Sequence, residues 1–389
     1  MRTGRSRRGG GAELRWVTAL PSVLVLLAAL PPPITGQATE YSGEIIVDGG
    51  VEDLVGISSI VPFDDGSIAV GQGQDHRVIV FGPDGARRAV LGRAGGGPGE
   101  FRDLSSRSGR AGQLVWVWDR SARRLTLLDA RGRLVRTTQA PIALSSPDGV
   151  TQPGIAASQP LALGPDGGLL LLLTVPRAMM SLRGWEDLQG HRTGSVWVTD
   201  GRRGTVVAGW PTATETCGTD PAQQTNCPVP RVAAGPDGRL LVIVSVEPDG
   251  SAQGTFAVRA FGRDGRLRFE SHLRYTTIAV PDRVIDSMRT IGTAPGLPAD
   301  RIRYWRDATF RTFYPPFTDV FIGQDDRTWI RLGPGRDSVD YLILDQRGRS
   351  VGTVTVPASS TIEAADATRF WATTRDEDGI ESVARYRLR

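Results

Sequence analysis

Residues 57–92 read ISSIVPFDDGSIAVGQGQDHRVIVFGPDGARRAVLG, and this stretch decides the fold class. Four short strand-like runs are separated by Asp64-Asp65-Gly66, by a polar loop before Arg77, and by Gly82-Pro83-Asp84-Gly85. Alternating apolar and polar residues bounded by Asp-Gly turns predict strands joined by tight turns. We therefore expect one small antiparallel meander here.

The same order of strands and turns returns along the chain. From Gly66 to Gly85 is 19 residues, and the matching glycines of the next unit, Gly112 and Gly132, are 20 residues apart. Four looser units follow, and their turns lie at Gly164–Gly167, Asp200–Gly201, Gly235–Gly238, Gly262–Gly265, Gln324–Asp326, Asp345–Gly348 and Ala364–Asp366. Repetition of one meander at such spacing is typical of a β-propeller.

The last unit has no residues left for a strand after its final run, Ser382–Leu388, whereas Gly43–Val47 is a strand without a hairpin partner. Pairing the two would remove the exposed sheet edges. We therefore expect an all-β fold, a six-bladed β-propeller closed by an N-terminal strand, with a short helical insertion.

The first two units resemble the NHL repeat. Residues 70–85 (VGQGQDHRVIVFGPDG) match its strand–loop–Arg–strand–turn core, and Gly92–Phe101 (GRAGGGPGEF) resembles the Gly-rich segment that leads into the next blade. Trp118-Asp119-Arg120 through Asp129 repeats the core. The resemblance is specific over residues 55–135 and rests on turn spacing beyond them, so it implies the propeller fold rather than an activity.

Residues 1–38 resemble an export signal. Five Arg precede an apolar run from Trp16 to Leu30, and Gly36-Gln37-Ala38 is a small-x-small cleavage site. The apolar run is short and contains Pro21, so a permanent membrane span is the weaker alternative. We expect a mature propeller of residues 39–389, periplasmic or secreted, without a stable membrane span after cleavage.

Composition excludes several chemistries. No Lys occurs among the 46 basic residues, which rules out Schiff-base and Ser-Lys catalysis and the P-loop lysine. Removing residues 1–38 deletes five Arg and one Glu, which takes the formal charge from +4 to zero, so nothing indicates nucleic-acid binding. We expect a monomer.

Cys217 and Cys227, the two cysteines, would form a disulfide in an oxidising compartment, and two free thiols are the alternative.

Three insertions interrupt the repeats, at about 176–194, 211–230 and 281–317. Helical spacing in the third predicts a helix around Val284–Met288 and a second short helix from Pro298. Long connections of this kind would form a lid or rim over the central channel, or are decoration without a role. The candidate ligand-binding residues in them are aromatic, basic or imidazole side chains: Trp185, His191, Arg301, Arg303, Tyr304, Trp305 and Arg306. A solvated surface is the simpler alternative.

These observations predict a binding or scaffolding propeller that uses its insertion-bearing face for a small molecule or a protein partner. The alternative is a propeller enzyme of the lyase or lactone-hydrolase type with a metal in the central channel. The three His (His76, His191 and His272) are far apart, and no G-x-S-x-G elbow or calcium loop occurs. We therefore assign no catalytic residue, no metal site and no cofactor, and favour binding over catalysis.

Overall fold

The computed structural model describes residues 38–139, 144–145, 151–152, 159–164, 166–174, 194–199, 204–210, 227–247, 253–333, 335 and 337–389. In these ranges it contains six four-stranded antiparallel blades in a ring, which confirms the predicted all-β propeller. None of the helices described is long and apolar enough to cross a membrane. The predicted signal peptide lies outside the described residues, apart from Ala38, and stays a prediction.

Each blade is a meander whose first strand lies at one edge of the sheet and whose fourth lies at the other. Blade 1 consists of β2 (Ile57–Pro62), β3 (Ile68–Gln72), β4 (Arg77–Phe81) and β5 (Arg87–Leu91). Blade 2 consists of β6 (Leu104–Ala111), β7 (Leu114–Asp119), β8 (Arg124–Leu128) and β9 (Leu134–Gln139). Blade 3 consists of β12 (Gln159–Leu163), β13 (Leu169–Thr174), β14 (Gly194–Thr199) and β15 (Gly204–Trp210). Blades 4 and 5 are β16 (Arg231–Ala234), β17 (Leu240–Glu247), β18 (Gln253–Gly262) and β19 (Leu267–Thr276); and β20 (Phe317–Ile322), β21 (Thr328–Leu332), β22 (Ser338–Leu344) and β23 (Ser350–Pro357). Blade 6 is β24 (Ser360–Ala365), β25 (Arg369–Arg375), β26 (Glu381–Leu388) and, as its fourth strand, β1 (Tyr41–Val47). The remaining elements are α1 (Gly49–Glu52), the pair β10 (Leu144–Ser145) and β11 (Thr151–Gln152), a 3₁₀ turn at Pro236–Gly238, α5 (Asp282–Gly292) and α6 (Ala299–Asp307).

Apolar side chains are buried between neighbouring blades. Among the described residues, each of the six seams holds its own cluster of buried apolar side chains, and the seam between blades 6 and 1 is no exception. Four tryptophans on blade strands are fully buried in these clusters: Trp116, Trp118, Trp329 and Trp371. Because burial of apolar area is the main stabilising term in folding, the seams hold the ring together.

The turn between the third and fourth strands of a blade packs on the fourth strand of the preceding blade. Gly85 in blade 1 has φ 78°, and a Cβ there would overlap the carbonyl oxygen of Ile46 in β1. Gly132 in blade 2 has φ 72° and stands in the same way against Ala89 of β5. Gly348 repeats the arrangement in blade 5 against Phe269, whereas a Cβ at Gly265 in blade 4 would make only an ordinary contact with Val207. At Gly85, Gly132 and Gly348, glycine is therefore needed both for its positive φ and for the close approach.

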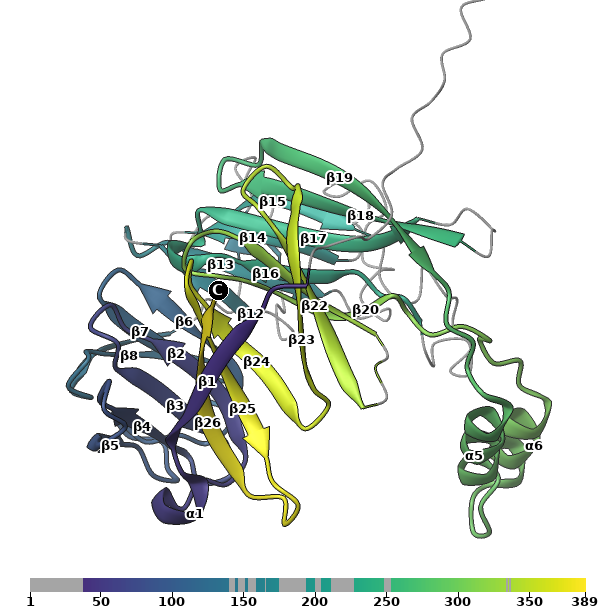
Figure 1. Ribbon diagram of the computed structural model, residues 1–389, viewed down its shortest axis with the longest axis horizontal. Coiled ribbons are helices and arrows are strands. Elements are labelled where there is room, and N and C mark those ends of the chain that lie inside the picture. Colours follow the sequence, from purple (N-terminus) through teal and green to yellow (C-terminus); the bar gives the residue numbers. More distant parts are fainter. Residues whose placement is uncertain are drawn as a thin grey trace, which may run out of the picture. The chain divides into compact units, whose positions relative to one another are not determined.

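Strand β1 lies beside β26 in the last sheet (Figure 1), with Tyr41 opposite Leu388 and Val47 opposite Val383. The ring of Tyr386 covers Gly43, and Tyr41 contacts Tyr386 edge to face with 5.2 Å between ring centroids. An aromatic ring over a strand glycine shields backbone that would otherwise face water. The pairing expected for this strand is therefore present. Strand β1 is the fourth strand of blade 6 and packs against blade 1, as β5 packs against blade 2.

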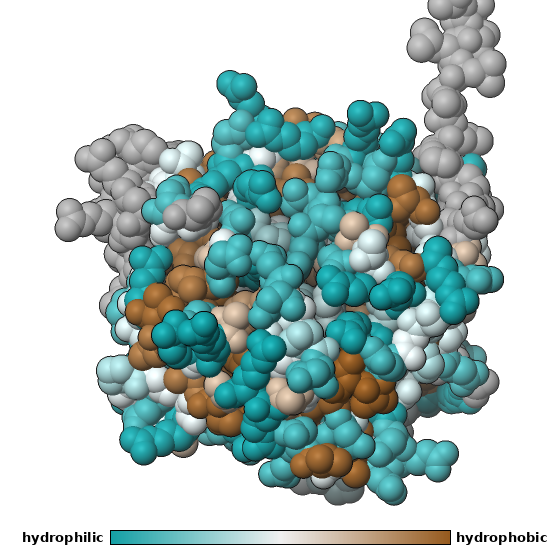
Figure 2. Space-filling view, turned by 60° about the vertical axis from the view of Figure 1, so that its left-hand side comes forward, coloured by the Kyte–Doolittle hydropathy of each residue, from teal (hydrophilic) through white to brown (hydrophobic). Residues whose placement is uncertain are grey.

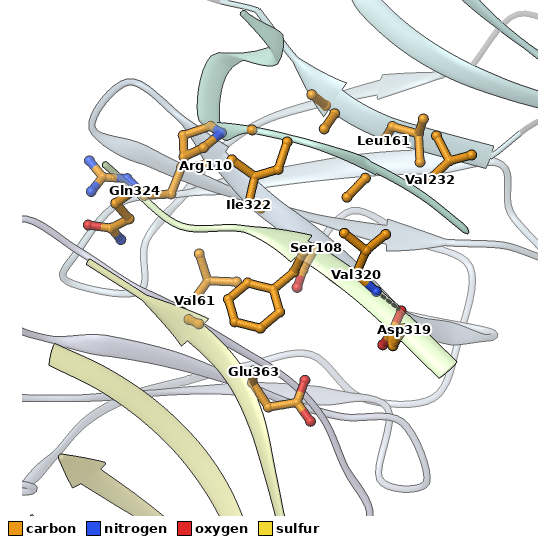
Figure 3. A pocket seen from close by; sticks show the side chains of 18 of the residues that line it. Val61, Ser108, Arg110, Leu161, Val232, Asp319, Val320, Ile322, Gln324 and Glu363 are labelled. Atoms are coloured by element: carbon orange, nitrogen blue, oxygen red, sulfur yellow. Dashed lines mark hydrogen bonds between the residues drawn. The ribbon is translucent and has the colours of Figure 1, made fainter. Parts of the chain in front are cut away.

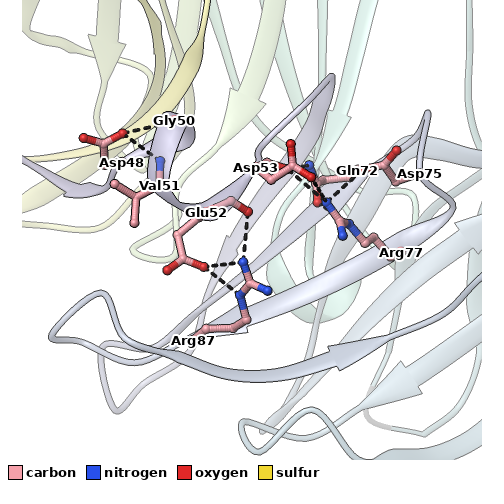
Figure 4. Close-up of polar contacts among 9 residues, drawn as sticks. All are labelled: Asp48, Gly50, Val51, Glu52, Asp53, Gln72, Asp75, Arg77 and Arg87. Carbon is pink, nitrogen blue, oxygen red and sulfur yellow. Dashed lines mark hydrogen bonds and ion pairs between the residues drawn. The ribbon is translucent and has the colours of Figure 1, made fainter.

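Polar contacts tie the segment after β1 to blade 1 (Figure 4). Glu52, at the end of α1, pairs with Arg87 of β5 at 2.6 Å, and the carbonyl of Asp53 accepts a hydrogen bond from Arg77 of β4 at 2.9 Å. On the blade 6 side, the buried carboxylate of Glu381 accepts a hydrogen bond from the backbone N–H of Ile57. These contacts fix the path of the segment that joins β1 of blade 6 to β2 of blade 1.

Antiparallel order gives the ring two different faces. Connections after the first and third strands of every blade leave at one face, which we call the turn face, and those after the second and fourth strands leave at the other, the connection face. The three expected insertions start and end at strand ends on the connection face, between β13 and β14, β15 and β16, and β19 and β20.

The third insertion contains the expected helices, α5 and α6. Their buried cluster consists of Ala308 and Phe310, against which Ile285, Met288, Tyr304 and Trp305 pack, and it includes no blade residue. In Figure 1 the two helices (green) lie apart from the blades. On the face that Figure 2 shows, hydrophilic residues predominate and hydrophobic ones form separate patches.

Substituting Gly85 by Ala should destabilise the protein more than the same change at Gly379. Both glycines have positive φ, 78° and 82°, so each alanine costs about 1–2 kcal/mol of backbone strain. Only Gly85 faces a neighbouring blade, since nothing lies within 4 Å of a Cβ at Gly379. The overlap with β1 should add roughly 1–3 kcal/mol. Thermal unfolding of the two variants measures the difference, and equal losses would show that this turn does not pack on β1.

Candidate functional site

The first strands of all six blades surround a central cavity of about 500 Å³. Its lining residues on these strands include Ser58, Val61, Ser108, Arg110, Leu161, Val232, Asp319, Val320, Phe321, Ile322 and Glu363, many of which are drawn in Figure 3. Most of the lining residues have apolar side chains, but polar atoms make up more of the surface that faces the cavity than apolar atoms do. A concave site of this size and mixture fits a small organic molecule.

The cavity is narrowed at the turn face by hydrogen bonds that cross the ring. Gln324, just after β20 in blade 5, donates from Nε2 to the carbonyl of Pro62 in blade 1 at 2.9 Å. The backbone N–H of Gly112 in blade 2 donates to Asp237 of blade 4 at 2.6 Å. Because each bond joins blades that are not neighbours, it passes over the inner edge of the blade between them. Access to the cavity is therefore expected from the connection face.

Carboxyl groups also gather at the turn face. Burial raises the pKa of Asp326, Arg239 opposes this, and the charges of Asp325 and Asp237 raise it further. Its Oδ1 is buried without a hydrogen bond among the described residues. No group of three or more His, Cys, Asp and Glu side chains in this part of the chain is arranged to hold a metal ion.

Two carboxyl groups line the cavity on the neighbouring strands β20 and β24. Asp319 accepts a hydrogen bond at Oδ1 from the N–H of Val320 at 2.9 Å. The pKa of Glu363 is raised to about 7, chiefly by burial and then by the charges of Asp319 and Glu381, while the charge of Arg331 lowers it. Glu363 therefore titrates near neutral pH, as a carboxyl group with a role in a site can do.

A β-bulge directs Glu363 to the cavity. The register of β24 with β25 skips one residue between Ile362 and Ala364, and that residue is Glu363. Blades 1 and 3 carry the same irregularity at Ser58 and Leu161, which also line the cavity. An extra residue in a strand turns its side chain away from the alternation of the sheet, and such bulges are common beside functional sites.

The ligand-binding residues predicted from the sequence lie elsewhere or outside the described part. Arg301, Arg303 and Arg306 are exposed on α6. Tyr304 and Trp305 pack inside the helical pair, where the Trp305 ring stacks on Phe310 at 5.8 Å. None of these five residues is among those that line the cavity, and their role in binding stays a prediction.

Trp185 and His191 lie outside the described residues, and so does Cys217. Cys227 is buried just before β16. The predicted disulfide between Cys217 and Cys227 therefore stays a prediction.

Sequence reasoning missed Asp319 and Glu363. Their strands were recognised only through the turns that follow them, and a single inserted residue leaves no mark in turn spacing. The available signal was an acidic residue in each of two otherwise apolar or small-residue strands, FTDVFI and STIEAA.

Comparison with known proteins assigns the chain to no family. No family model matches the chain, and no curated protein matches its sequence. The resemblance to NHL repeats is therefore not confirmed.

Solved structures match at low identity. A member of the DUF4221 family from Bacteroides vulgatus is 10% identical, with 91% of this chain and 99% of that one covered and a TM-score of 0.48. Regucalcin, a calcium-binding protein from Agrobacterium tumefaciens, is 12% identical over 91% and 97% of the two chains, with a TM-score of 0.40. Virginiamycin B lyase from Staphylococcus aureus is 11% identical over 90% and 100%, with a TM-score of 0.44. The six blades described above, and not these likenesses, show that the chain is a six-bladed β-propeller. Likenesses this distant say nothing about its ligand.

Substituting Glu363 by Gln should remove a pH dependence of stability. Because the pKa is raised from 4.5 to about 7 in the folded protein, folding favours the protonated carboxyl. That contribution is complete below about pH 4.5 and is lost as the pH rises through about 7, by up to roughly 3 kcal/mol.

Thermal unfolding of wild type, Glu363→Gln and the exposed control Glu377→Gln across this range tests the expectation. Glu363→Gln should equal wild type near the acid limit and exceed it in stability above neutral pH. Parallel profiles of all three proteins would show that the Glu363 carboxyl is fully hydrated.

Proposed function

We propose that the protein is an exported propeller that binds a small organic molecule in its central cavity, entered from the connection face. The observation that carries the proposal is the cavity itself, which all six blades line and which cross-ring hydrogen bonds narrow at the turn face. Apolar side chains such as Val61 and Val232 supply contact area, and the polar groups of the wall supply hydrogen bonds and orientation.

Export to the periplasm or the medium is the second part of the proposal. Five Arg followed by an apolar run and a small-x-small site at 36–38 support it. Insertions on the connection face would form the rim of the entrance, where the exposed Arg301, Arg303 and Arg306 are available to a ligand or a protein partner.

An enzyme of the lyase or lactone-hydrolase type is the second candidate, and one observation favours it. A carboxyl group with a pKa near 7 beside an ionised carboxylate is suited to general acid–base catalysis near neutral pH. Turnover of a bound molecule, with loss of turnover in Glu363→Gln while binding persists, would decide for this candidate.

Filling the cavity should abolish ligand binding without unfolding the protein. Ser108 lies on β6 in the cavity wall, so Ser108→Trp places an indole in the binding space, whereas Ser350→Trp places it on the surface. Native mass spectrometry of protein recovered after export, followed by a thermal-shift screen of small organic molecules, identifies ligands. Wild type and Ser350→Trp should bind them and Ser108→Trp should not. Undiminished binding by Ser108→Trp would locate the site outside the cavity.

A further inference from the structure

Glu363 is the lining group that best suits contact with a ligand. Its side chain lies largely within the protein, yet it is among the cavity-lining residues, and no hydrogen bond to its carboxyl is found among the described residues. The carboxyl oxygens of Glu363 are not among the buried side-chain atoms that lack a partner, so they are reachable from the cavity, and a ligand there can form hydrogen bonds with them. The bulge at this position places the group there specifically.

The second acid strengthens the attraction for positive charge. Asp319, on the adjacent first strand, lines the same cavity, and its bond from Val320 N–H fixes the carboxylate. Two arginines also line the cavity, but Arg110 is held at the turn face by Asp64 at 2.5 Å, and Arg231 is exposed at the start of β16. The cation that acts on the pair is Arg331, opposite Asp319 on β21, so two carboxyl groups share one guanidinium and an excess of negative charge faces the cavity.

The neighbouring wall suits the apolar part of an organic cation. Phe321 and Val320 follow Asp319 on β20, and Val61 and Val232 lie on the strands to either side of blades 5 and 6. Aromatic faces attract cations, and a carboxylate beside an aromatic ring is a recurring arrangement for ammonium groups.

From this arrangement we infer that the cavity binds a small amine in its protonated form, with the ammonium group between Glu363 and Asp319 and the hydrocarbon part against the apolar wall. This inference rests on the proposed binding function and names the class of ligand for the same site.

A consequence is that binding depends on pH. The charges of Asp319 (β20) and Glu381 (β26) oppose the ionisation of Glu363, and the charge of Arg331 (β21) favours it. The hydroxyl of Tyr341 (β22) is neutral at neutral pH and accepts a hydrogen bond from the N–H of Ile362 at 3.1 Å. Glu381 is itself paired with Arg375. An ammonium ion binds the ionised carboxyl best, so binding should release a proton and strengthen as the pH rises through 7.

Benzylamine and benzyl alcohol are matched probes, since they differ in charge and hardly in size. Ligand-observed NMR titration of the mature protein to millimolar probe, at about pH 6 and about pH 8, should show benzylamine affinity rising about tenfold with pH, because the amine stays protonated while the carboxyl ionises. Benzyl alcohol should bind more weakly and without this change.

Variants assign the effect to the carboxyl pair. Glu363→Gln should weaken benzylamine binding and remove its pH dependence, whereas Glu377→Gln should match wild type. Asp319→Asn should move the midpoint of the pH dependence downward, because the charge of Asp319 raises the pKa of Glu363. Unfolding curves confirm that each variant is folded.

Other outcomes overturn the inference in distinguishable ways. If both probes bind equally and Ser108→Trp blocks them, the cavity binds ligands but does not select amines. If an amine binds with unchanged pH dependence in Glu363→Gln, the ammonium lies elsewhere. If benzylamine gives no signal while another molecule binds the cavity, the amine class is wrong and the proposed function stands. If no molecule binds in the cavity, both proposals fail.

Discussion

A four-stranded antiparallel sheet in this chain carries apolar side chains on both faces, and neither face can be left in water. The only partners available to a blade are its two neighbours, so each blade is packed on both sides by others. Among the described residues, this packing produces six seams of buried apolar side chains. Every blade has two neighbours only when the last blade packs against the first. The seam between blades 6 and 1 differs in one respect, because β1 and β26 come from opposite ends of the described chain.

Everything at the centre follows from that packing. The first strand of every blade is brought to the axis, where its side chains contribute to a shared cavity as well as to the seams. Tight Asp-Gly turns on one face approach closely enough for bonds across the ring, and the longer connections all leave from the other face. A cavity with one narrowed end is thus a product of the topology, and bulges such as the one at Glu363 then determine which side chains enter it.

Sequence patterns were sufficient for the ring and insufficient for the site. Turn glycines such as Gly85 and Gly132 are constrained by positive φ and by the neighbouring blade, so they recur at fixed spacing and reveal the blades. Trp116 and Trp371 lie on blade strands and are buried in seams, where large aromatic side chains find apolar partners. No such repeat marks Glu363, because its direction depends on a bulge, and its pKa depends on burial and on the charge of Asp319, which is distant in sequence and on another blade. Aromatic residues near Arg301 were conspicuous in the sequence for a different reason, since Tyr304 and Trp305 hold two helices together.

Hydrogen exchange on the mature protein tests the closed ring most directly. The strands β26 and β22 are both third strands of their blades, the first paired outward with β1 and the second with β23. Amides of β26 that pair with β1 should be protected to the same degree as the amides of β22 that pair with β23, since both lie inside a sheet. Rapid exchange of those β26 amides, at the rate of a free sheet edge, would contradict the account.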